Sequence, residues 1–285
     1  MSVGLRVTKV LAAVVLFAGA AALAAPAPGA AARDADPEDG GVRDGVYENA
    51  YFGLSLPLAD GWAKGLDGPL PSTRGYYVLA NLTPADASTA TMLIAAQDLF
   101  FEPKPVANAA EAVQRFAGSV GPASGLTLSE PPRQVMIASL VFSRVDYEGA
   151  GLYHMLLATD RRCHVLSFAL TARDPDALDR LARSLKDARW TDAADESVPL
   201  CVREQPAAAR RARALSEALA PSAEPVPVRL IIAADGRVRH VHVISAPQAT
   251  AELLTLTLAR WAFDPYLSDG QPIAIETGVM IGPSR

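Results

Sequence analysis

The sequence predicts an α+β protein of two domains, an N-terminal α/β sandwich with an antiparallel sheet and a small C-terminal ββαβ module. The chain has 285 residues, which fits two domains of about 100 to 150 residues each. Half of its residues are apolar and a fifth are charged, a balance typical of folded globular proteins. Strand-like runs surround two separated helical segments before residue 194, and a second set of alternating apolar runs starts at residue 226.

The first residues have the pattern of a secretory signal peptide. Arg6 and Lys9 precede an apolar, alanine-rich run that ends in the small-x-small site Ala22-Leu23-Ala24. An uncleaved anchor is the alternative, but the run is short for a membrane span of about 20 residues. We therefore expect residues 1–24 to be removed by cleavage after Ala24 and the chain to be exported. Residues 25–45, rich in Ala, Pro, Gly and Asp, are predicted to be a disordered lead-in.

The first domain is predicted to span residues 46–194. Asn108, with Glu111 three residues later, is a capping-box pattern that indicates a helix start. Asp174-Pro175 opens a second helix, because proline is tolerated in the first turn, and apolar residues repeat along it at helical spacing. The expected strands are 46–57, 76–82, 91–101, 135–148, 152–159 and 164–172, and Trp190 ends the domain.

A family resemblance agrees with this prediction. The opening reads Y-x-N-x-x-F-G-L-x-L-P from Tyr47 to Pro57, Gly61-Trp62 follows, and a late strand runs into the Asp-Pro helix. This pattern resembles the PsbP-like domains over residues 46–194. The resemblance implies a small α/β/α module of a kind that usually binds partners rather than catalyses a reaction.

The C-terminal module is predicted to cover residues 207–285, after a polar linker at 195–206. Two alternating runs flank Asp235-Gly236, a strong hairpin signal because both residues tolerate positive φ. A helix over 248–260 and a closing strand over 273–281 follow. Trp261 continues the spacing of Leu254 and Leu258, so we expect it to close the module core.

The order hairpin, helix, W-x-F-x-P, Asp-Gly and strand resembles the C-terminal domain of TonB-type energy transducers, over residues 205–282. The resemblance implies a periplasmic module that recognises a short peptide on outer-membrane transporters. The long proline-rich stretches of true transducers are missing from this sequence. A helical segment before the hairpin carries Arg210, Arg211 and Arg213, which are either a solvated face or a contact for anionic lipid or an acidic partner.

We find no motif for catalysis, for a cofactor or for a metal. The chain has no Gly-x-Ser-x-Gly, His-Glu-x-x-His, Ser-x-x-Lys, P-loop or Cys-x-x-Cys sequence. His240 and His242 share one face of a strand, but no third ligand lies nearby in sequence, so they are predicted to be surface residues with Val241 and Val243 on the buried face. The net charge of −5 and the lack of a basic stripe argue against a nucleic-acid partner.

The two cysteines offer one possible disulfide. An exported chain meets an oxidising compartment, so Cys163 and Cys201 either form a bridge or remain as two separate thiols. Cys163 and His164 are neighbours on a strand and point to opposite faces, which argues against a catalytic Cys–His pair.

These patterns give one preferred function and one alternative. We expect an exported, non-catalytic protein that binds an envelope protein or an outer-membrane transporter by strand addition to an edge strand with Ile275, Thr277, Val279 and Ile281. Proline at Val279 is the test that this hypothesis suggests. The alternative is an exported hydrolase with its active site between the domains.

Overall fold

The computed structural model describes residues 35–65, 68–85, 90–102, 104–191, 199–203 and 225–282. The fold is α+β and is mostly antiparallel sheet, with three α-helices among these residues. The predicted signal peptide, residues 25–34 of the predicted lead-in and the arginine cluster at 210–213 lie outside the described residues. No helix in the described part of the chain is long and apolar enough to cross a membrane.

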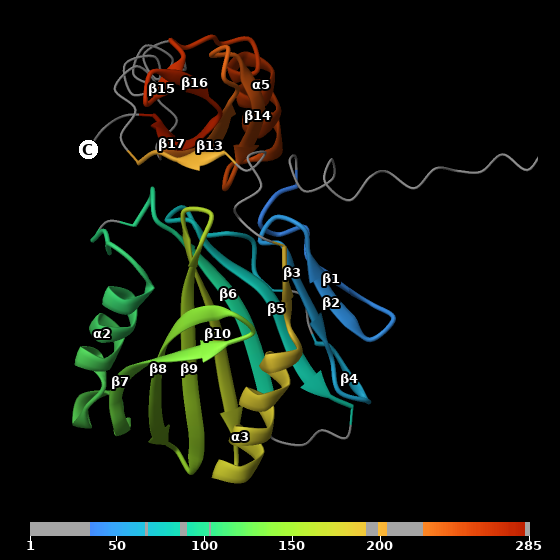
Figure 1. Ribbon diagram of the computed structural model, residues 1–285, viewed down its shortest axis with the longest axis vertical. Coiled ribbons are helices and arrows are strands. Elements are labelled where there is room, and N and C mark those ends of the chain that lie inside the picture. Colours follow the sequence, from blue (N-terminus) through green and yellow to red (C-terminus); the bar gives the residue numbers. More distant parts are fainter. Residues whose placement is uncertain are drawn as a thin grey trace, which may run out of the picture.

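A seven-stranded antiparallel sheet is the centre of the N-terminal region (Figure 1). Its strand order is β4-β5-β6-β10-β9-β8-β7. The strands are β4 (Trp62–Lys64), β5 (Tyr76–Pro84), β6 (Thr91–Asp98), β7 (Thr127–Ile137), β8 (Leu140–Gly149), β9 (Leu152–Arg161) and β10 (His164–Ala172).

A second, four-stranded sheet covers part of one face of this sheet. Its order is β1-β2-β3-β11, with β1 (Gly41–Arg43), β2 (Val46–Asn49), β3 (Leu54–Pro57) and β11 (Arg189–Trp190). It shares its core with helix α3 (Pro175–Ser184) and the turn η2 (Leu185–Asp187). Helix α2 (Ala109–Ser119), followed by the turn η1 (Pro122–Ser124), packs through Val113 on Val145 and Val165 in a separate core. The central sheet therefore has helix α2 on one face and the second sheet with α3 on the other.

Both helices start where the sequence predicts. Asn108 caps α2 by accepting a hydrogen bond from the Glu111 backbone N–H, and Asp174 caps α3 in the same way from Ala177. Leu178, Leu181 and Leu185 are buried, so the predicted apolar stripe of α3 faces the core.

Several expected elements differ from the structure. The expected strand 46–57 is two strands, β2 and β3, which pair with each other. The predicted strand 135–148 is two strands, β7 and β8, because the chain turns at Ala138 and Ser139 with φ of 46° and 67°. The predicted disordered lead-in contains β1, which pairs with β2 and so orders residues 41–43.

The C-terminal module is a four-stranded sheet with one helix packed on it. Its order is β12-β17-β13-β14, with β12 (Leu200–Cys201), β13 (Val226–Ile232), β14 (Val238–Val243) and β17 (Ile275–Ile281). Helix α5 (Gln248–Leu258) buries Leu254 and Leu258 against the sheet, and a small hairpin, β15 (Tyr266–Ser268) and β16 (Gln271–Ile273), precedes β17. Trp261, expected in the core, is only half-buried, while Phe263 is buried.

The module lies at one end of the central sheet (Figure 1). One face of its own sheet is under α5, and the other face lies against the N-terminal region. A methyl group added at Gly278 of β17 would meet the Phe100 Cβ at 2.5 Å, which shows how closely this face approaches. The two predicted regions are therefore in direct contact, through buried side chains of both.

Candidate functional site

The layer between the two domains contains a group of buried charged side chains, which we call the junction cluster. Its members are Tyr51, Asp98, Arg162, His164, Arg229 and Glu276. Arg229 lies at its centre and is only 2% exposed. Its guanidinium forms ion pairs with Asp98 and with Glu276, the latter at 2.8 Å. The same guanidinium donates a hydrogen bond of 2.8 Å to the Tyr51 hydroxyl, which donates to Glu276 at 2.9 Å.

Strand register explains why these residues meet. Arg229 pairs with Gly278, and Ile231 pairs with Glu276, so these four positions share the face of the module that meets the first domain. Asp98 ends β6 at the end of the central sheet next to the module. Its carboxylate accepts a hydrogen bond of 2.7 Å from the Phe100 backbone N–H as well as the Arg229 ion pair.

The charges of the junction cluster balance. Asp98 and Glu276 supply two negative charges, and Arg229 and Arg162 supply two positive ones. Burial by itself would raise the pKa of Glu276, but Arg229 and Arg162 hold it below its ordinary value. Burial raises the pKa of Asp98, an effect that Arg229 and the Phe100 N–H oppose. This set is held together by mutual pairing, because each charge would be unstable here without its partners.

His164 completes the cluster as a neutral side chain. Its Nδ1 lies 2.7 Å from the Arg162 carbonyl oxygen, so this nitrogen carries the proton and donates. Its Nε2 lies 3.7 Å from Asp98 and has no hydrogen-bond partner among the described residues. Burial and then the charge of Arg229 lower the pKa of His164 well below its ordinary value.

The junction cluster has the residue types of an active site, but a substrate could not reach it from solvent. Asp98 and His164 are fully buried, and the adjoining pocket has a volume of only about 10 Å³. A substrate needs a far larger cavity. The geometry supports a joint between the domains.

Further contacts extend this joint. Cys163 and Cys201 form a disulfide with a Cα–Cα distance of 5.6 Å, which ties the turn between β9 and β10 to β12. Next to the disulfide, the Arg203 guanidinium donates a hydrogen bond of 2.8 Å to the Val106 carbonyl oxygen. Residues 199–203, which the sequence suggested were linker, thus belong to the folded module.

The histidines of β14 also lie at the joint, which corrects their predicted surface position. His242 is buried and stacks on Tyr77, and its Nε2 lies 2.9 Å from Glu38. His240 lies 2.8 Å from Asp36. The alternation of residues along β14 indicates only which face each side chain shares within the module. It does not indicate that the first domain covers the face that carries the two histidines. No group of three metal-ligating side chains occurs in the described part of the chain.

The predicted partner-binding strand, β17, is not an outer strand along its whole length. It pairs with β13 throughout and with β12 at Ile275 and Glu276. The side chains named for partner contact, Ile275, Thr277, Val279 and Ile281, are all buried in the module. A partner at this strand would therefore meet its backbone and the exposed Met280 side chain instead of these four side chains.

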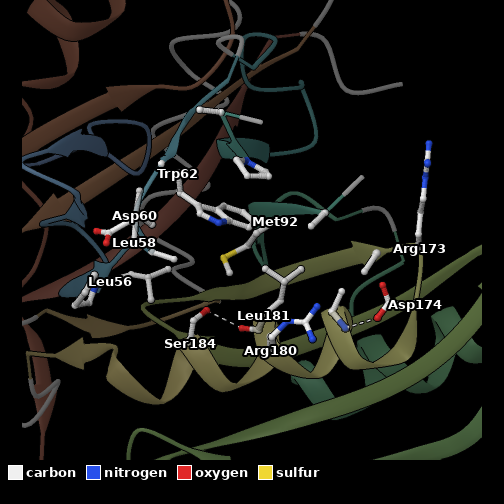
Figure 2. Close-up of a pocket in the computed structure, with 18 residues that line it drawn as sticks. Leu56, Leu58, Asp60, Trp62, Met92, Arg173, Asp174, Arg180, Leu181 and Ser184 are labelled. Atoms are coloured by element: carbon white, nitrogen blue, oxygen red, sulfur yellow. Dashed lines mark hydrogen bonds between the residues drawn. The ribbon is translucent and has the colours of Figure 1, made fainter. Parts of the chain in front are cut away.

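Close to α3, which lies away from the module in Figure 1, a separate pocket opens in the first domain (Figure 2). Its volume is about 640 Å³, within the usual range for small-molecule sites. It lies between the β3–β4 segment and α3. Leu56, Leu58, Trp62, Met92 and Leu181 form its apolar lining, and charged side chains stand around it.

Comparison with known proteins finds similarity to solved structures. No family model matches the chain, and no curated protein sequence matches it. The chain is similar to the solution structure of cyanobacterial PsbP (CyanoP) from Synechocystis sp. PCC 6803, with 14% identity and a TM-score of 0.39, over 51% of this chain and 91% of that one. This is in line with the predicted PsbP-like resemblance, but a TM-score this low carries no conclusion about function. The TonB-like resemblance stays a prediction.

Proposed function

We propose that this chain is an exported, non-catalytic binding protein that captures an extended peptide of an envelope protein, such as an outer-membrane transporter, along the outer edge of β17. The observation that carries the proposal is the direction of the β17 backbone groups. The backbone N–H of Leu200 donates a hydrogen bond to the Ala274 carbonyl, and the N–H of Val202 donates one to the Glu276 carbonyl. Carbonyls of alternate residues point to the same side of a strand, so the N–H and C=O of Gly278 and Met280 also point away from β13.

β12 ends where these groups begin. No strand of the described residues pairs with this side of β17 beyond Glu276. Two residues supply up to four backbone hydrogen bonds, each worth about 1 kcal/mol net. Met280 and Leu200 are exposed apolar side chains beside this edge, and they offer additional contact area to a bound peptide.

The opposite edge of the module sheet is less suited to a partner. β14 is the terminal strand there, and Arg237, just before it, is already bridged to Ala262. Arg239 also stands on it, and charged side chains are a usual means of blocking edge pairing. The β17 edge, with Gly278 and Met280, carries no such charge.

The test is capture from an envelope extract by the full mature chain and by two proline variants. Met280→Pro removes an outward N–H and leaves the β13–β17 ladder intact, because Met280 faces Pro227 in a pair without hydrogen bonds. Val241→Pro is the matched control on the outer side of β14. Val279→Pro is unsuitable for this test, because the Val279 N–H faces β13 and its loss would damage the sheet itself.

We expect Met280→Pro to lose a partner that the unmodified chain and Val241→Pro both retain. Loss with Val241→Pro alone would move the site to β14. Equal retention by all three chains would rule out strand addition at either edge.

A further inference from the structure

The pocket of the first domain is built as a binding site with an apolar interior. Leu56, Met92 and Leu181 are buried and form its floor, and the Trp62 ring stands on the side opposite α3 (Figure 2). These side chains come from β3, β4, β6 and α3, which share the main core of the domain. A site on such elements is preformed, so a ligand gains the apolar contacts without ordering a loop first.

One charge faces this pocket. Arg180 lies beside Leu181 on the pocket side of α3, whereas the Asp60 carboxylate and the Arg173 side chain point away from it (Figure 2). Asp174 is already used, since its carboxylate caps α3. Arg180 has no acidic partner among the described residues, so its guanidinium is available to an anion at the mouth of the pocket.

From this arrangement we infer that the pocket binds an amphipathic carboxylate, with its aliphatic body against Leu56, Trp62 and Met92 and its carboxylate at Arg180. Arginine suits this role because its fork of N–H donors matches a carboxylate. The inference does not depend on strand addition at β17, because the pocket lies close to α3, which lies away from the module (Figure 1). It gives the first domain a ligand of its own.

The experiment is calorimetric titration of the full mature chain with decanoate and with decanol, both below the concentrations at which they aggregate. The two probes share the aliphatic body and differ in charge. Arg180→Gln removes the cation, and Arg183→Gln is the matched control on the same helix, since Arg183 bonds only to the Asp179 carbonyl and does not line the pocket. Ala177→Trp fills the pocket from a half-buried position on α3, with Ala59→Trp as a second filling variant from the exposed opposite wall.

We expect the unmodified chain to bind decanoate more tightly than decanol, and Arg180→Gln to weaken decanoate binding by about fivefold, the size of one exposed ion pair, without changing decanol binding. Arg183→Gln should bind both probes like the unmodified chain, and a folded filling variant should bind neither. Failure of the unmodified chain to bind decanoate, equal binding of the two probes, or undiminished binding by a folded filling variant would each overturn the inference. Thermal melting of each variant establishes that it is folded.

Discussion

Arg229 of β13 and Asp98 of β6 lie 131 residues apart in the sequence and form a buried ion pair across the junction of the two domains. Neither side chain is more than 2% exposed. Glu276 and Tyr51 share the same guanidinium, so one arginine connects three segments of the chain. The pair joins the module to the first domain.

Removing this arginine should destabilise the whole protein. Arg229→Leu leaves Asp98 buried without its cation, which costs about 3–5 kcal/mol of unfolding free energy. Replacing Asp98 by leucine as well should recover part of that loss, because Glu276 retains Arg162 at 3.4 Å. Urea unfolding of the two variants measures the difference. Arg237→Leu, at a residue whose side chain is 83% exposed, is the control and should change stability by less than about 0.5 kcal/mol. A similarly small effect of Arg229→Leu would show that the ion pair contributes nothing.

The tight approach at Gly278 gives a second prediction. A methyl group there would overlap Phe100, so Gly278→Ala should push the module away from the first domain and cost about 1–3 kcal/mol. Gly118→Ala in α2 meets no atom within 4 Å and should instead stabilise by about 0.5–1 kcal/mol, because alanine favours the helix. The melting temperatures of the two variants test both expectations. A melting temperature that Gly278→Ala leaves unchanged would argue against close packing of the module on the first domain.

The disulfide should add stability by restricting the unfolded chain. Cys163 and Cys201 close a loop of 38 residues, for which the chain-entropy model gives about 4 kcal/mol. The double variant Cys163→Ser and Cys201→Ser should therefore unfold at a lower urea concentration than the oxidised chain. Its unfolding midpoint should match that of the unmodified chain after reduction. A reductant that leaves the unfolding curve of the native protein unchanged would contradict the bridge.

Stability should fall as the solution becomes mildly acidic. The folded-state pKa of His164 is depressed, so the unfolded chain binds a proton near its ordinary value of about 6.5 while the folded chain does not. The contribution of His164 to the free energy of unfolding is complete above pH 6.5. It is lost as the pH falls toward the folded-state pKa, by up to about 1.4 kcal/mol per pH unit. Unfolding measured from about pH 7.5 to 5.5 tests this in a His154→Gln background, because burial also lowers the pKa of His154. Adding His164→Gln should flatten the slope, and an unaltered slope would exclude His164 as its source.

Local signals predicted much of this fold. Asp174-Pro175 starts α3, and Asp235-Gly236 joins β13 and β14 with Gly236 at a φ of +83°, because caps and turns depend on adjacent residues. The turn at Ala138-Ser139 was missed, since neither residue is a usual choice for positive φ.

The junction cluster could not be predicted, because strand register and domain contact bring it together. One signal was available. Arg229 interrupts the otherwise apolar run Val226–Ile232, and a charge in a fully buried strand requires a partner. The sequence does not reveal that Asp98 and Glu276 are those partners.

The most direct test of the proposed binding edge is amide hydrogen exchange of β17 in the free full-length chain. We expect fast exchange at Gly278 and Met280, whose N–H groups face outward, and slow exchange at Thr277 and Val279, whose N–H groups bond to β13. Equal protection of all four amides would show that this edge is already occupied in the free protein and would contradict strand addition there.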